Sequence, residues 1–325
     1  MSYTSHYSVL KKECLDNLCN PVDSIDGIHY FADLTFGGGG HSFEFLYRNK
    51  NFKVISTDQD PDALKNGYRR IEEEKMVDRI SLLDTNFVHF PHLVREKFPN
   101  LFENGNGLQG ILLDLGVSSH HFDEGSRGFS FRFEGPLDMR MDYESNEFQT
   151  AEEIVNTYRE EQLAKIFWEY GEEKYSRKIA AKIVEQRKTS PIKTTKDLEN
   201  IIFHCYPKEL RHGKTNPSTR VFQALRLEVN QELEVLAEVI GQLIPLLKVG
   251  GRLAIISFHS LEDRIVKNLF RDLSSSTDLP VEIITKKPII PSDEEILNNS
   301  RSRSAKLRVI ERVLKKKEKN KYKQD

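Results

Sequence analysis

The chain is poor in several features that define whole classes of protein. Its 325 residues include only three cysteines, Cys14, Cys19 and Cys205, and no two of them form a CxxC pair. These cysteines cannot build a zinc site without several histidines from elsewhere, so a reduced, cytoplasmic setting is expected. No apolar run approaches the roughly 20 residues that a membrane span needs. The first residues lack a charged segment followed by an apolar stretch, so no secretory signal is expected.

An excess of one charge is also missing. The chain has 48 Lys and Arg residues against 50 Asp and Glu residues, for a net charge of -2. A protein that coats nucleic acid without selectivity needs many uncompensated cations, so the composition argues against that class. The cations are unevenly spread, however, because residues 314–325 form a basic tail. We expect this tail to be solvated, with RNA contact as the alternative.

Short apolar runs alternate with amphipathic stretches over the first 115 residues. This alternation is typical of a parallel sheet covered by helices. The fourth apolar run is apolar on both faces, as a central parallel strand should be. The predicted strands of this part are 30–36, 53–57, 80–83 and 110–115, and the first helix between them spans 41–47.

The alternation stops at residue 116 and returns near residue 252. Between these points lie a polar, loop-like segment and several helical patterns, which cover 116–142, 151–170, 173–187, 195–204 and 219–247. After a fifth strand at 252–257 and a helix at 261–273, residues 281–285 and 307–313 are expected to pair as an antiparallel hairpin. We therefore predict an α/β domain from residues 1–115 and 218–313, interrupted by an all-helical insert at 116–217. Such an insert would hang over the carboxyl ends of the strands, where ligands bind in open α/β sheets.

Four consecutive glycines, Gly37 to Gly40, follow the first strand and open the first helix. Glycines at this point let the backbone turn sharply and approach a ligand closely, although a tight turn without a ligand would also use them. Asp58 ends the second strand about 20 residues later, where a carboxylate accepts hydrogen bonds from ribose hydroxyls. Because an acid there would repel a 2′-phosphate, the ligand should carry an unphosphorylated adenosine ribose.

Two cofactor classes fit the glycine loop. A phosphate-binding P-loop is excluded because Gly40 is followed by His41-Ser42 rather than by Lys and Ser or Thr. A dinucleotide fingerprint is nearly met, but its third glycine is replaced by Ser42, which leaves an NAD-linked oxidoreductase as the alternative. Asp114 closes the fourth strand before a polar loop, and an antiparallel hairpin follows the fifth strand. This arrangement is that of class I, Rossmann-like methyltransferases, so S-adenosylmethionine is the favoured cofactor.

Seven segments, in the same order along the chain, resemble one family, the bacterial ribosomal RNA small-subunit methyltransferase H or MraW family. They are His41 after the four glycines, Asp58–Pro61, Gly110–Ser119, Arg127–Phe131, Gly135–Asp142, Thr219–Arg226 and Ile256–Lys267. The resemblance runs from His6 to about Arg312. It implies transfer of a methyl group from S-adenosylmethionine, without a metal, to the exocyclic N4 of a cytidine in 16S rRNA within the small ribosomal subunit.

The resemblance also implies roles for individual residues. It places the cofactor against a set of residues that follow the strands, namely Gly39, Gly40, His41, Asp58, Phe87 and Asp114, with Phe87 beside the adenine ring. The chain departs from the family at His121, which stands where a Gln assigned to the cofactor is usual. A neutral imidazole replaces one amide hydrogen bond but not the donor and acceptor together.

Two hypotheses concern the acceptor RNA. The hydrogens of the attacking amine need acceptors as positive charge develops, and Asp114 and His259 are the candidates because both follow neighbouring strands. The structural alternative for His259 is an imidazole held by the acids that follow it. Arg127, Arg140 and Arg220 are candidates for contact with RNA phosphates or the target base, with local ion pairs as the alternative. For the chain as a whole, a non-catalytic RNA-binding scaffold is the third hypothesis, after the methyltransferase and the NAD-linked oxidoreductase.

Overall fold

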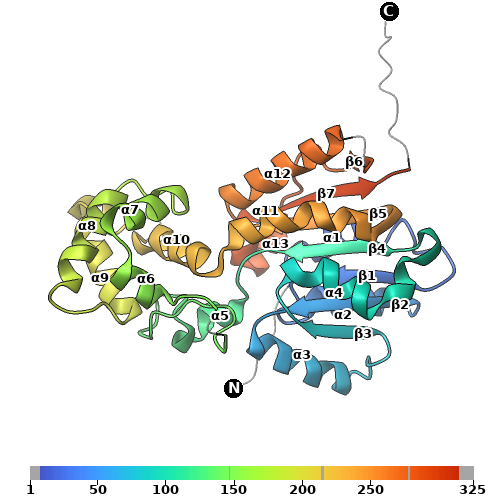
Figure 1. Ribbon diagram of the computed structural model, residues 1–325, viewed down its shortest axis with the longest axis horizontal. Coiled ribbons are helices and arrows are strands. Elements are labelled where there is room, and N and C mark those ends of the chain that lie inside the picture. Colours follow the sequence, from blue (N-terminus) through green and yellow to red (C-terminus); the bar gives the residue numbers. More distant parts are fainter. Residues whose placement is uncertain (1–7, 146, 214–215, 277–278, 315–325) are drawn as a thin grey trace, which may run out of the picture. The chain divides into compact units, whose positions relative to one another are not determined.

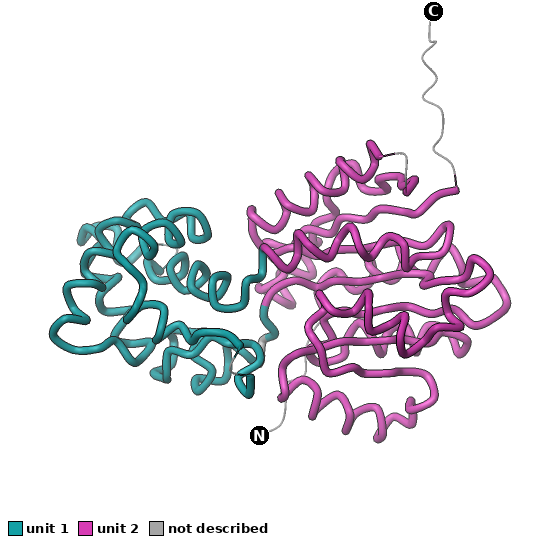
Figure 2. Tube along the Cα trace, viewed as in Figure 1, with its two compact units in different colours: residues 1–4, 117–233 teal, residues 5–116, 234–325 magenta. Residues whose placement is uncertain are grey.

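The computed structural model describes residues 8–145, 147–213, 216–276 and 279–314. The predicted basic tail therefore lies outside the described residues, apart from Leu314. The described chain divides into two compact units (Figure 2). Val117–Leu233 form a helical unit, and the residues on either side of that segment together form an α/β unit. We describe each unit by itself.

The α/β unit is built on one seven-stranded sheet in the order β3-β2-β1-β4-β5-β7-β6 (Figure 1). The strands are β1 (His29–Asp33), β2 (Phe52–Asp58), β3 (Ile80–Asp84), β4 (Leu108–Asp114), β5 (Leu247–Ser257), β6 (Val281–Ile283) and β7 (Lys306–Arg312). Neighbours from β3 to β5 run parallel, whereas β7 runs antiparallel to both β5 and β6. The prediction of a class I methyltransferase sheet with a terminal antiparallel hairpin is thus confirmed.

Helices cover both faces of this sheet and bury its alternating side chains. The helices of the unit are α1 (Lys11–Leu18), α2 (Gly40–Arg48), α3 (Pro61–Glu73), α4 (Phe90–Lys97), α11 (Glu232–Leu243), α12 (Ser260–Ser275) and α13 (Asp293–Asn298). Phe31 and Leu112 belong to one core cluster, while their chain neighbours Ala32 and Ile111 belong to the other. This switch of face at each residue follows from the period of two in a strand. Six of the seven residues of β4 are buried, as expected for a strand covered on both faces.

The helical unit has its own hydrophobic core. Its helices are α5 (Ser119–Asp123), α6 (Ala151–Thr157), α7 (Glu160–Glu169), α8 (Ser176–Arg187), α9 (Thr195–Cys205) and α10 (Ser218–Asn230). Among the described residues from 116 to 217, strand-like pairing is limited to one isolated bridge between Pro136 and Thr194. The prediction of an all-helical insert is confirmed.

The predicted single helix over 219–247 is wrong. Two helices, α10 and α11, meet at Gln231, whose φ of 49° places it in the left-handed region. The α10 helix packs against α6 and α7, so it belongs to the helical unit. The division between the units consequently falls after Leu233 rather than at the predicted residue 217. The pattern at 151–170 likewise forms two helices, because Tyr158 and Arg159 are extended.

Candidate active site

The carboxyl ends of the parallel strands place three aspartates along one edge of the sheet. Asp33, Asp58 and Asp114 are the last residues of β1, β2 and β4, which are adjacent in the sheet. Such an edge is where open α/β sheets bind ligands. The sequence singled out Asp58 and Asp114 but missed Asp33, although its position at a strand end is the same signal.

The glycine loop joins β1 to α2 beside these aspartates. Gly39 adopts φ 76° at the N-cap of α2, where an L side chain is strained. A Cβ atom built on Gly39 would lie 2.6 Å from Cζ of Phe36. The loop therefore needs glycine for two separate reasons, backbone conformation and close approach. Gly40 is the first residue of the helix.

Asp58 holds the glycine loop in place. Its Oδ2 accepts a hydrogen bond of 2.7 Å from the backbone N–H of Gly37, and its Oδ1 accepts one of 2.9 Å from Asp60. Burial raises the pKa of Asp58 to about 7 despite these hydrogen bonds. Each carboxylate oxygen has a second lone pair, so this group is able to accept further hydrogen bonds from a ligand. The contact with Gly37 was not foreseen from the sequence.

Asp33 holds the start of α2 and Thr35 in place through its side-chain carboxylate. Its Oδ2 accepts a 2.6 Å hydrogen bond from the hydroxyl of Ser42, and its Oδ1 accepts one of 3.3 Å from the N–H of Thr35. Burial raises the pKa of Asp33 to about 6. Ser42 thus has a structural partner at the position where a dinucleotide fingerprint has glycine.

His41 and Asp114 form a polar pair at this edge. Nε2 of His41 lies 3.5 Å from Oδ2 of Asp114, a charge contact rather than a good hydrogen bond. Both ring nitrogens of His41 and Oδ1 of Asp114 are buried without a hydrogen-bond partner among the described residues. Burial lowers the pKa of His41, but Asp114 and Asp33 raise it more, so it lies above its usual value. Buried polar atoms that lack partners are uncommon and point to a ligand.

Two further contacts tie the neighbouring loops to this edge. The N–H of Asp114 donates a 2.7 Å hydrogen bond to the hydroxyl of Thr35, which joins β4 to the loop after β1. Phe87 begins a short 3-10 helix after β3 that Asn86 caps. Asn86 also donates to Gln59, the residue after Asp58, over 2.8 Å. The structure thus brings the segment that carries Phe87 to the segment that carries Asp58.

His259 caps the helix that follows β5. The N–H of Glu262 donates to its Nδ1 at 3.4 Å, and its Nε2 lies 3.0 Å from Oε1 of Glu262. The second oxygen of Glu262 accepts from the backbone N–H of Phe258 at 2.7 Å. This reciprocal arrangement is a capping box, and it matches the structural alternative for His259.

His121 lies in the helical unit, as do the three arginine candidates. The N–H of Ser118 donates a 3.1 Å hydrogen bond to Nδ1 of His121, which closes the first turn of α5. The His121 ring is buried, with its centroid 4.7 Å from that of Phe129. His121 therefore has a local role in the helical unit, and its contact with a cofactor stays a prediction.

The arginine candidates differ in exposure. Arg127 is only 6% exposed and donates to the carbonyls of Arg140 and Met141 at 3.2 and 2.8 Å. The Arg140 guanidinium donates two 2.8 Å hydrogen bonds to Asp138, an ion pair of the kind proposed as the alternative. Arg220 is exposed on α10 and makes a 3.3 Å hydrogen bond to the carbonyl of Glu172. The structure therefore favours local roles for Arg127 and Arg140, while Arg220 has the accessible side chain.

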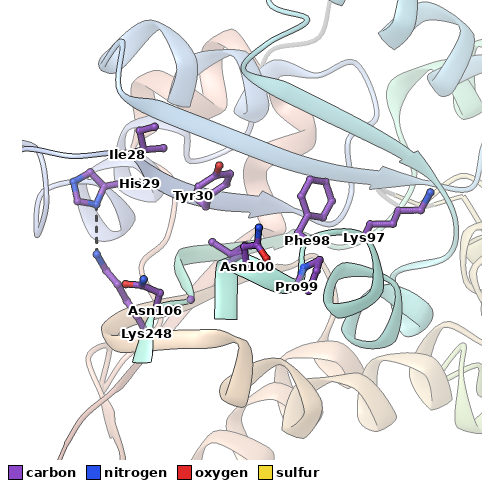
Figure 3. Close-up of a pocket in the computed structure, with 11 residues that line it drawn as sticks. Ile28, His29, Tyr30, Lys97, Phe98, Pro99, Asn100, Asn106 and Lys248 are labelled. Atoms are coloured by element: carbon purple, nitrogen blue, oxygen red, sulfur yellow. Dashed lines mark hydrogen bonds between the residues drawn. The ribbon is translucent and has the colours of Figure 1, made fainter. Parts of the chain in front are cut away.

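A separate pocket of about 410 Å³ lies at the amino ends of the strands (Figure 3). His29 and Tyr30 from the start of β1, Phe98 after α4, and Lys248 from β5 contribute to its lining. Nζ of Lys248 lies 3.4 Å from Nδ1 of His29. Since β1 ends at Asp33, this pocket and the aspartate edge lie at opposite ends of the strands. It is not the predicted cofactor site.

Two kinds of feature are lacking within the described residues. No group of three or more His, Cys, Asp and Glu side chains there is placed to hold a metal ion. No helix in the described ranges combines the length and the apolar character that crossing a bilayer requires. All three cysteines are free and buried.

Comparison with known proteins identifies the family. The profile of the MraW methylase family matches residues 3–313. A relative from Fusobacterium nucleatum named ribosomal RNA small subunit methyltransferase H is 45% identical over 95% of this chain and 97% of its own length. One of the same name from Sulfurihydrogenibium is 48% identical over 95% of this chain and 99% of its own. A solved rRNA methylase from Streptococcus thermophilus aligns over 95% of this chain and 99% of its own, with a TM-score of 0.43 and 11% identity. The match to the family profile and the identity with these two relatives show that the chain belongs to the MraW methylase family.

Proposed function

We propose that the protein transfers a methyl group from S-adenosylmethionine to the exocyclic N4 of a cytidine in 16S rRNA, acting in the cytoplasm on the small ribosomal subunit. The observation that carries the proposal is the polar edge formed by Gly39, His41, Asp58 and Asp114 in a member of this family. The curated relatives are named as small-subunit methyltransferases. The N4 position and the cytidine rest on the resemblance described above.

The residues at this edge fit an adenosine cofactor. The Asp58 carboxylate would accept from the ribose hydroxyls, and the glycine loop would let the backbone approach the cofactor closely. Phe87 would lie beside the adenine ring. The unpartnered buried atoms of His41 and Asp114 would find their partners on polar groups of the cofactor. When bound, S-adenosylmethionine supplies a methyl group that its sulfonium already activates.

The protein's own contribution is position and charge. The cytosine N4 lone pair is delocalised into the ring, so the amine is a weak nucleophile and must be held in line with the methyl carbon. The base must also leave its stack to reach the edge. As N4 gains positive charge, a carboxylate at hydrogen-bond distance stabilises the transition state. Asp114 is the better candidate for this acceptor, because its buried carboxylate Oδ1 lacks a hydrogen-bond partner among the described residues, whereas Nδ1 of His259 already accepts from Glu262 at the start of α12.

The helical unit is proposed to recognise the RNA. One exposed cation of this unit, Arg220, lies on α10, where a guanidinium can contact phosphate. Neither an oxidoreductase nor a non-catalytic scaffold has an observation in its favour. Ser42 already donates to Asp33 where a dinucleotide site needs glycine, and Asp58 and Asp114 end the strands β2 and β4.

The test uses labelled S-adenosylmethionine and small subunits from cells that lack this modification. After incubation with the full-length protein, the RNA is digested to nucleosides, and label is expected in N4-methylcytidine. Asp114→Asn should lower kcat by about 100-fold or more, whereas His259→Ala should keep kcat within a few-fold and lose about 1 kcal/mol of stability as a lost helix cap.

Three results would contradict the proposal. Label at another nucleoside would reject the N4 assignment, and binding of NADH without methyl transfer would favour the oxidoreductase. Normal turnover by Asp114→Asn with intact cofactor binding would remove the acceptor role. The cofactor affinity of each variant, measured by calorimetry, separates loss of binding from loss of chemistry.

A further inference from the structure

A second pocket of the α/β unit borders the candidate active site. It has a volume of about 260 Å³ and is lined by Phe258 and His259, which directly follow β5. A Cβ atom built on Gly116 would lie 3.5 Å from Cδ2 of Phe258. Gly116 is two residues after Asp114, so Phe258 lies beside the loop that directly follows the proposed amine acceptor. All these residues belong to the α/β unit.

Most of the remaining lining comes from the long connection between β6 and β7. Ile290, Pro291 and Ile296 supply apolar surface, and Arg303 is an exposed cation of the lining. Nothing in the sequence motifs assigned a role to this connection. The pocket therefore combines an aromatic ring, aliphatic surface and an accessible guanidinium.

The charges around this pocket leave it net positive. No Asp or Glu is among the lining residues. Lys306, which also lines it, lies 3.2 Å from Asp263, a carboxylate that it shares with Arg308 at 2.7 Å. Glu295 on α13 is buried and accepts a 2.7 Å hydrogen bond from the N–H of Leu10. Arg303 is thus the cation of the lining for which the structure provides no balancing acid in the pocket.

This chemistry is that of a single-stranded nucleic acid site, where a base stacks on an aromatic or apolar wall and a cation meets the backbone. A volume of about 260 Å³ is below the range of about 300 to 1,000 Å³ typical of drug-sized ligands, which suits one base rather than several. We propose that this pocket holds the unstacked base of a nucleotide flanking the methylated one, with a phosphate against Arg303. The identity of the strand as substrate RNA rests on the proposed function, whereas the binding chemistry does not.

Direct binding tests the pocket without methyl transfer. The probe is a fluorescein-labelled ten-residue oligocytidylate, measured by anisotropy with the full-length protein. Arg303→Gln and Ile290→Asn each alter an exposed lining side chain, and each should raise the Kd about tenfold. Lys287→Gln is the matched control, because Lys287 is exposed on the same connection but does not line the pocket. It should change the Kd less than twofold.

An abasic oligomer of equal charge separates base from phosphate. Ile290→Asn should not affect its binding, whereas Arg303→Gln should weaken it. In methyl transfer, the two variants should raise KM for the small subunit and leave kcat and the affinity for S-adenosylmethionine unchanged.

Several outcomes would overturn the inference. Equal Kd values for the parent and both pocket variants would do so, as would failure of the parent to bind the oligomer. If the variants raised KM for assembled subunits while the oligomer bound normally, the pocket would dock a ribosomal protein instead. If methyl transfer failed altogether but the variants still weakened oligomer binding, the proposed function would be rejected and the base pocket retained.

Discussion

Replacing Gly39 by alanine tests the geometry of the cofactor loop. At φ 76°, an alanine costs about 1 to 2 kcal/mol in backbone strain. Its Cβ atom would also lie 2.6 Å from the Phe36 ring. That ring has little room to move, because it also lies against Gly67, where a built Cβ atom would be 2.5 Å from its Cε1. Overpacking of this kind costs about 1 to 3 kcal/mol, so Gly39→Ala should lower the free energy of unfolding by about 2 to 5 kcal/mol in total.

Gly241→Ala is the matched control for this prediction. Gly241 lies in α11, is exposed, and would place its Cβ with nothing within 4 Å outside its own helix backbone. Alanine in a helix is favoured over glycine by about 0.5 to 1 kcal/mol, so this variant should be slightly more stable. Urea unfolding with calorimetry of cofactor binding measures both effects. If the two variants were equally stable, the strain and close contact assigned to Gly39 would be refuted.

Two other predictions separate roles assigned above. Because ribose hydroxyls donate to an ionised carboxylate, and burial raises the pKa of Asp58 to about 7, affinity for S-adenosylmethionine should rise with pH. The rise should be about tenfold from pH 6 to pH 8, the range over which Asp58 loses its proton, and calorimetry should find it absent in Asp58→Asn. Arg127→Gln removes hydrogen bonds from a buried guanidinium, so it should destabilise the helical unit by about 2 kcal/mol, measured by the fluorescence of the single tryptophan, Trp168. If Arg127→Gln kept its stability but bound RNA more weakly, Arg127 would contact phosphate after all. If the affinity for S-adenosylmethionine did not change with pH, the ribose would not bind at Asp58.

The strands of the α/β unit were predictable because strands that are buried in the sheet consist of short runs of apolar residues. The run from Gly110 to Leu115 is apolar throughout, and β4 is buried on both faces. The hairpin of β6 and β7 was also predicted correctly, since both runs carry β-branched residues. The break at Gln231 was missed, because Asn230-Gln231-Glu232 contains neither glycine nor proline. Asn230 is instead held by the backbone of Met139 and Met141, a contact between distant segments that local propensity cannot reveal.

The candidate site was predictable in its position but not in its internal contacts. Residue types at strand ends were enough to select Asp58 and Asp114, because the fold gathers those ends. The same argument should have selected Asp33. The burial of Arg127 was not foreseeable, because a sequence shows the charge of a side chain and not the carbonyls that fold around it. The capping role of His259 was readable in part from Glu262 three residues later.

The insertion of the helical unit between β4 and β5 also affects how the protein folds. Asp114 pairs with Ile256 across the whole insert, so the centre of the sheet is completed only after a long stretch of chain. Closing a loop of about 140 residues costs about 2 kcal/mol more than closing one of about 15. A helical unit that folds first fixes the distance between its two ends and removes most of that cost. During synthesis, β1 to β4 are therefore made before β5, the strand that pairs with β4. The helical unit is the first part of the chain able to complete a core of its own.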